Sequence, residues 1–154
     1  MFSISQNSLQ KKWKLYRDFK SNYTEEDLLY RMSKCVDNMV DQGVKYIRTF
    51  VDSDGIVGQK CIDSAIKIKN EYIDKVKIDI AIQPLEGLES KESMYNFIEA
   101  CSKADYIGGL PDRDSSPEKH IDLIFDLASR TNKPVDIHVG RNNLPCEKET
   151  EMVL

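Results

Sequence analysis

This 154-residue chain has no long apolar run, no excess of positive charge and no signal-peptide pattern in its first residues. No run approaches the roughly 18 apolar residues that a membrane span requires. The net charge is −4, whereas proteins that read nucleic acid usually carry a basic patch. Residues 1–7 lack the basic and then apolar pattern of a signal peptide. We therefore expect a cytoplasmic protein whose partners are neither membranes nor nucleic acids.

Cysteine is sparse and widely spaced. Cys35, Cys61, Cys101 and Cys146 include no C-x-x-C pair, which excludes zinc-ribbon and dithiol redox sites. Three of the four fall within expected helices, where a buried free cysteine behaves as a small hydrophobe. We expect these to be reduced structural thiols and leave the role of Cys146 open.

A regular alternation of helix and strand signals runs from residue 24 onward. Thr24 and Asp27 have the spacing of a capping box, and apolar residues then recur at helical spacing as far as Gly43, which is placed as a C-terminal cap. In the last helix we expect a buried stripe that includes Phe125. The pattern predicts strands at 44–51, 77–83, 105–109 and 135–139, with helices at 9–20, 24–42, 57–74, 89–103 and from 116 onward.

Helices of about 15 residues between strands of about six favour parallel crossovers over hairpins. A closed barrel of eight such units needs about 250 residues, so this chain has the length of half a barrel or of a small open parallel sheet. We predict an α/β fold: a partial TIM-type (βα) barrel of about four parallel βα units with an N-terminal helical segment. We expect one domain over residues 1–154, with residues 1–23 as the helical segment within it.

Polar loops follow the expected strands, and all of them lie on one side of a parallel sheet. Such a collection of acidic, amide, guanidinium and imidazole groups suits a polar substrate or a metal, although loops are also polar simply because water surrounds them. The loops contain residues 52–54 (DSD), 83–86 (QPLE), 111–114 (PDRD) and 138–143 (HVGRNN).

The two histidines have different surroundings. His138 ends a β-branched run, so it would stand at the carboxyl end of a strand, the face where barrels of this kind do their chemistry. His120 lies beside Glu118 and Lys119 on a helix, and we expect it to be solvated or partly buried at the surface. A metal hydrolase site takes three protein ligands plus a water, so a complete site would need carboxylates or residues from another chain.

The order of four segments resembles cytosine deaminase and its relatives in the amidohydrolase superfamily. Those enzymes carry strand ends of the forms RTHVD, PQEG, ADxxGxxP and DxHxDE at comparable intervals. The resemblance extends from about Leu9 to Leu154 and corresponds to the second to fifth barrel strands of the family. The matching segments are residues 46–52 (YIRTFVD), 80–88 (IAIQPLEGL), 104–111 (ADYIGGLP) and 135–138 (VDIH).

The resemblance implies a divalent metal, usually zinc or iron, and hydrolysis of a C–N bond by a metal-activated water. His138 inherits the role of a metal ligand. The resemblance also implies a nucleobase-like or amide substrate. The residues that it places around this substrate are Gln83, Glu86, Asp112, Arg141 and Asn142.

Several positions depart from the family pattern. Phe50 replaces the second-strand histidine, Leu85 replaces the substrate-reading glutamine, and Arg141 replaces the proton-shuttling glutamate. Arginine stays protonated and cannot act as a general base, so no catalytic residue is assigned. Nothing before Leu9 resembles the family's H-x-H pair of metal ligands. We therefore expect a fragment of an amidohydrolase with an incomplete metal site.

Three functions remain open at this point. The first is a metal-dependent hydrolase of a C–N bond, incomplete in this chain. The second is a non-catalytic remnant or assembly subunit, since the open strand edges of a half barrel invite pairing in a homo-oligomer or with a complementing chain. The third is an α/β protein that binds a small anion through Arg113 or Arg141.

Overall fold

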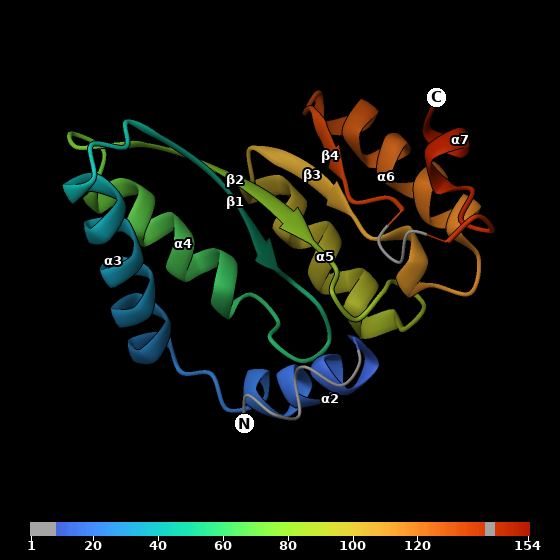
Figure 1. Cartoon of the computed structure of the whole chain (residues 1–154), viewed down its shortest axis with the longest axis horizontal. Coiled ribbons are helices and arrows are strands. Elements are labelled where there is room, and N and C mark those ends of the chain that lie inside the picture. The colour runs from blue at the N-terminus through green and yellow to red at the C-terminus, as the bar shows by residue number, and fades with distance from the viewer. Residues whose placement is uncertain (1–8, 141–143) are drawn as a thin grey trace.

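The computed structural model describes residues 9–140 and 144–154. Its four strands form one parallel sheet in the order β1-β2-β3-β4, so each strand pairs with the next along the chain. Figure 1 shows helices running alongside this sheet, with α2 near the ends of β1 and β2. The elements are α2 (Leu9–Lys20), α3 (Glu25–Asp41), β1 (Tyr46–Asp52), α4 (Lys60–Glu71), β2 (Lys77–Gln83), α5 (Lys91–Lys103), β3 (Tyr106–Gly109), the 3-10 helix η1 (Pro111–Arg113), α6 (Pro117–Thr131), β4 (Val135–Ile137) and α7 (Glu149–Val153).

This arrangement confirms the predicted α/β fold class with about four parallel βα units and an N-terminal helical segment. The element boundaries differ by a few residues from those expected. The expected strand at 135–139 ends at Ile137, so His138 follows the strand instead of lying in it. None of the helices in the described ranges is long and apolar enough to cross a membrane.

Local caps fix the helix starts that the sequence pattern predicts. The Thr24 hydroxyl accepts a hydrogen bond from the Asp27 amide at 3.2 Å, and the Ser90 hydroxyl accepts one from the Ser93 amide at 3.0 Å. Each bond satisfies an amide that the first helical turn leaves without a backbone partner. These caps place α3 and α5 at fixed points of the chain and so set the lengths of the loops between helices and strands.

The core lies between the sheet and helices α3 to α6. Three alternate residues of β2, Ile78, Ile80 and Ile82, pack with residues of α4, α5 and α6 in one apolar cluster. Since side chains alternate across a strand, the remaining β2 residues point to the opposite face, which we call the inner face. The largest buried apolar side chains are Ile62, Ile80, Ile82, Phe97, Ile107 and Ile124.

Two expectations about burial were wrong. Phe125 on α6 is 43 % exposed, because the buried stripe runs through Ile121, Ile124 and Ala128 and leaves the neighbouring position turned away from the sheet. Cys35 on α3 is exposed, whereas Cys61 and Cys101 are buried as expected.

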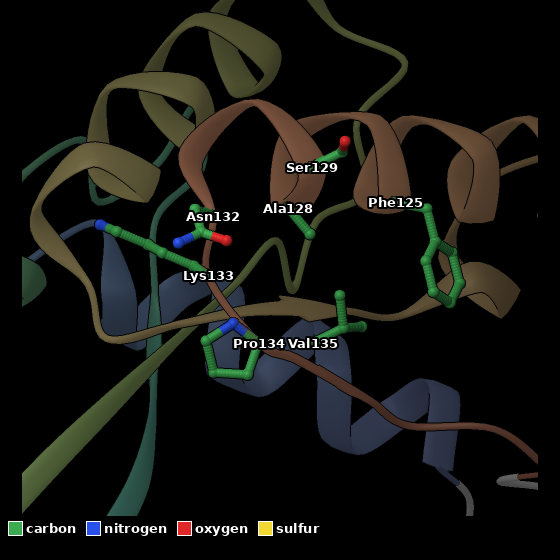
Figure 2. A pocket seen from close by; sticks show the side chains of 7 residues that line it. All are labelled: Phe125, Ala128, Ser129, Asn132, Lys133, Pro134 and Val135. Carbon is green, nitrogen blue, oxygen red and sulfur yellow. The ribbon is translucent and has the colours of Figure 1, made fainter.

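Phe125 lines an open hollow between α6 and the start of β4 (Figure 2). The cation in this hollow is already engaged, because the Lys133 ammonium donates to the carbonyl oxygens of Cys101, Ser102 and Ala104 at the end of α5. The hollow lies at the amino end of the sheet, where side chains in barrels of this type serve stability.

Candidate functional site

The carboxyl ends of the strands gather the candidate residues at one edge of the sheet. Asp52 and Gln83 are the last residues of β1 and β2, and they are register partners. His138 follows β4, and its amide donates to the Gly109 carbonyl at the end of β3. Parallel pairing thus brings Asp52, Gln83 and His138 to the same edge, as the sequence predicts.

The inner face is polar, and the sheet curves enough for β1 and β4 to meet across it. The Arg48 Nε atom lies 3.3 Å from Asp136 Oδ2, although two strands separate β1 from β4. The rings of Phe50 and His138 meet edge to face, with centroids 4.3 Å apart. His138 is therefore an exposed side chain whose ring packs against the residue that replaces the family's second-strand histidine.

Gly108 of β3 makes room for this contact. A Cβ atom there would overlap with the carbonyl oxygen of Ile82 and would lie 3.2 Å from Phe50 Cε1. The absence of a side chain therefore lets β2 and β3 pair closely while the Phe50 ring lies over the inner face.

Helix α2 is fastened across the carboxyl ends of β1 and β2 by ion pairs. Arg17 pairs with Glu86, whose side chain is only 8 % exposed, and the Arg17 Nε atom donates to Glu86 Oε2 at 2.9 Å. Lys20 is buried beside Asp52 and Asp54. Burial lowers the pKa of Lys20, but the two carboxylates raise it more, so its pKa lies above the ordinary value and it stays charged. Glu86 is therefore held by α2 at this edge.

Arg113 joins η1 to the same group of residues. Its Nε atom donates to the Leu85 carbonyl at 2.6 Å, and its guanidinium lies 4.0 Å from the centroid of the Trp13 ring on α2. The Nη2 atom is 4.0 Å from Glu86 Oε2. Asp112, next to it in η1, is half-buried.

Sequence reasoning missed the structural role of His120. The expectation of a solvated or partly buried surface residue was wrong, since His120 is 2 % exposed. Its Nε2 atom accepts from the Leu110 amide at 3.1 Å, so the proton of a neutral ring is on Nδ1, which lies 2.6 Å from Asp114 Oδ2. The second Asp114 oxygen accepts from the Leu88 amide at 2.8 Å. His120 and Asp114 thus tie together the loops after β2 and β3.

The described residues do not form a complete metal site. Within residues 9–140 and 144–154, no three His, Cys, Asp or Glu side chains are grouped so that they could hold an ion. Asp52, Asp54 and Glu86 are already paired with cations from α2. Arg141 and Asn142, two of the predicted pocket residues, lie outside the described residues.

Comparisons with known proteins agree with this arrangement. No family model matches the chain. The chain is 31% identical over 151 residues to an uncharacterized protein of Haemophilus influenzae. The match covers 96% of this chain and 55% of that protein. It is 25% identical over 127 residues to N-isopropylammelide isopropyl amidohydrolase of Pseudomonas sp. strain ADP, covering 79% of the chain and 31% of that protein.

Two crystal structures of 5-methylcytosine deaminase from Klebsiella pneumoniae superimpose on 95% of the chain at 25% identity. One holds 5-fluorocytosine, with a TM-score of 0.84, and the other holds phosphonocytosine, with a TM-score of 0.88. The chain is thus similar in sequence and fold to part of a deaminase and of an amidohydrolase of the amidohydrolase superfamily. A structure of N-isopropylammelide isopropylaminohydrolase from Burkholderia multivorans matches 65% of the chain at 28% identity, with a TM-score of 0.61.

The amidohydrolase match also defines how much of such a protein this chain represents. The chain spans about half the length of the Haemophilus influenzae protein and about a third of the Pseudomonas amidohydrolase. It covers 36% and 37% of the chains in the two deaminase structures. These shares fit a partial barrel of four βα units, as predicted from the order of the four motifs.

Proposed function

We propose that this chain supplies part of the substrate pocket of a metal-dependent amidohydrolase that hydrolyses a C–N bond in a nucleobase-like molecule. The observation that carries the proposal is the position of His138, which follows β4 at the carboxyl edge of a sheet that superimposes on 5-methylcytosine deaminase. Active sites of (βα) barrels lie at this edge. The ligands of the deaminase structures, 5-fluorocytosine and phosphonocytosine, support a pyrimidine-like substrate.

In this proposal His138 is one ligand of a zinc or iron ion, and the remaining ligands come from outside the described residues. Such an ion, when bound, would supply an activated water near neutral pH. Gln83 offers an amide to the substrate from the end of β2. Asp112 is a further proposed pocket residue, as are Arg141 and Asn142, which lie outside the described residues. Glu86 contributes through its ion pair with α2, which fixes the loop after β2.

The surroundings of Arg113 favour this proposal over binding of a small anion. Its guanidinium donates to Leu85, lies close to Glu86 and stacks on Trp13. An anion would have to compete with a carboxylate that is already in place. The role of a non-catalytic assembly subunit is supported by a different observation, the exposed inner face, where Tyr46 is 47 % exposed.

Binding of 5-fluorocytosine, followed by fluorine NMR, tests the proposal without requiring turnover. The full chain, with and without added zinc, should broaden and shift the fluorine signal. His138→Ala should abolish any effect of zinc, and any zinc that the wild-type chain retains after desalting should be lost in this variant. An unchanged fluorine signal at millimolar protein, together with no retained zinc, would refute a pocket in this chain and leave the assembly role.

The proposal also includes a partner chain, a cellular location and the extent of the domain. We propose that a second copy or a complementing chain pairs with the free edges of β1 and β4, since exposed strand edges invite pairing. Sedimentation of a stable monomer at high concentration would contradict this. We also propose a cytoplasmic location and a single domain over residues 1–154, with residues 1–23 as its helical insertion.

A further inference from the structure

Lys20 is a buried charged residue, and burying a charge costs free energy unless the charge is paired. Its side chain is 2 % exposed, at the end of α2 and against the carboxyl ends of β1 and β2. Its Nζ atom lies 2.5 Å from Asp54 Oδ2, 3.2 Å from Asp52 Oδ2 and 4.0 Å from Glu86 Oε1. Removing one member of a buried ion pair leaves an uncompensated charge, so these carboxylates depend on Lys20.

The two carboxylates that lie closest to Lys20 have different second partners. Asp54 Oδ1 accepts from the amides of Ile56 and Val57 at 2.9 and 3.1 Å, which fixes the loop after β1. Asp52 Oδ1 accepts from Gln83 Nε2 at 2.9 Å, at the end of β2. Lys20 therefore acts on the loop through one carboxylate and on a predicted pocket residue through the other.

The contact with Asp52 decides which way the Gln83 amide faces. An ionised carboxylate only accepts hydrogen bonds, so the amide nitrogen must face Asp52 and the carbonyl oxygen must face away from it. Among the described residues, none donates to Gln83 Oε1. Gln83 thus presents an acceptor at the edge of the sheet where the pocket is proposed.

The ionised state of Asp52 in turn depends on Lys20. Burial raises the pKa of Asp52 above its ordinary value even with Lys20 in place, and the positive charge of Lys20 opposes part of that increase. Without Lys20 the Asp52 carboxyl would take up a proton more readily and could donate to Gln83. The Gln83 amide could then turn over and present its nitrogen to the pocket.

We propose that Lys20 is a positioning residue, which holds Asp52 so that Gln83 presents its carbonyl oxygen to a ligand that carries an N–H donor. The choice of ligand rests on the proposed function of Gln83 as a pocket residue. The positioning of Gln83 by Lys20 can be tested without any ligand.

Lys20→Met tests the positioning, because methionine keeps most of the length of the side chain and removes its charge. Arg17→Met is the matched control: it breaks the other ion pair that fastens α2, the one with Glu86, and leaves Lys20 and Asp52 in place. Both variants loosen the same helix, so loss of stability alone does not distinguish them. The side-chain amide signal of Gln83 does.

In nitrogen-15 correlation spectra of the full chain, assigned with Gln83→Leu, we expect Lys20→Met to shift the Gln83 amide signal and Arg17→Met to leave it in place. Lys20→Met should also weaken binding of 5-fluorocytosine about tenfold, the effect of one hydrogen bond. If Lys20→Met does not fold, Asp52→Asn is the second variant, since it keeps the volume and should move the same signal.

A Gln83 signal that stays in place in Lys20→Met and Asp52→Asn, or that shifts equally in Arg17→Met, would overturn the positioning role. If the wild-type chain binds no 5-fluorocytosine but the Gln83 signal responds to Lys20→Met alone, Lys20 retains its positioning role and the proposed function fails. The two hypotheses are thus separated by one set of samples.

Discussion

Replacement of Gly108 by alanine tests whether close pairing of β2 and β3 sets the geometry of the inner face. Gly108 lies in β3, one residue after Ile107, which is the register partner of Ile82. An added methyl group would overlap with the Ile82 carbonyl oxygen and would lie 3.2 Å from Phe50 Cε1. The overlap involves backbone, so no rotation of a side chain relieves it, and the two strands have to move apart.

The expected cost has two parts. Forcing a methyl group into a packed region costs about 1–3 kcal/mol, and each ladder hydrogen bond that weakens costs about 1 kcal/mol. We expect Gly108→Ala to lower the free energy of unfolding by about 2–4 kcal/mol, a large part of the roughly 5–15 kcal/mol that stabilises a typical domain. With a urea slope of about 2 kcal/mol per molar, the midpoint should fall by about 1–2 M.

Urea unfolding of the full chain, followed by circular dichroism, provides the measurement. Gly55→Ala is the matched control, because a Cβ atom there would meet only side chains, the nearest being Ser93 Oγ at 3.3 Å. This control should cost less than about 1 kcal/mol, as side chains can move aside. If Gly108→Ala unfolds within 0.5 M of the wild-type midpoint (about 1 kcal/mol), β2 and β3 are not as close as described and the argument fails.

Two further predictions concern titration and thiol chemistry. Burial raises the pKa of Asp105, but the hydrogen bonds from Lys69 and the Ile80 amide, together with the charges of Lys69 and Lys133, outweigh this and hold the pKa below the ordinary value. Asp105 therefore contributes stability above about pH 4 that is lost as pH falls through its folded-state pKa. The melting temperature of Asp105→Asn, measured from pH 7 to pH 3, should therefore be lower at neutral pH and fall less steeply than that of wild type; equal slopes would contradict the lowered pKa of Asp105. Burial raises the pKa of Cys61 and Cys101 to about 12, so an aromatic disulfide reagent at pH 8 should modify two thiols in the native chain and four after unfolding, the two reactive ones being Cys35 and Cys146.

The sequence alone predicts the parts of the fold that depend on local patterns. Apolar spacing and the cap at Thr24 locate the helices, and β-branched runs locate the strands. The predicted burial of Phe125 and Cys35 was wrong, because some residues at apolar spacing on a helix still point away from the core. The parallel order of the strands follows from the length of the crossovers.

The candidate site was less predictable because its contacts join distant segments. His138 could be placed at a strand end from its own neighbours, but its contact with Phe50 depends on the curvature of the sheet. The burial of His120 depends on Asp114 and Leu110, six and ten residues away. No pattern in the sequence places Lys20 beside Asp52.

The ion pairs of α2 also determine when, during folding, this helix can dock at the carboxyl edge of the sheet. Lys20 and Asp54 are 34 residues apart, and Arg17 and Glu86 are 69 residues apart. A helix of 12 residues is marginal on its own, and closing long loops costs entropy that only the finished contacts recover. During synthesis α2 leaves the ribosome before β1 and β2, yet its partners exist only once β2 and the loop after it are in place. Pulse-labelling of amides should find α2 protected after β1 and β2, so this helix joins the fold after strands that are synthesised later.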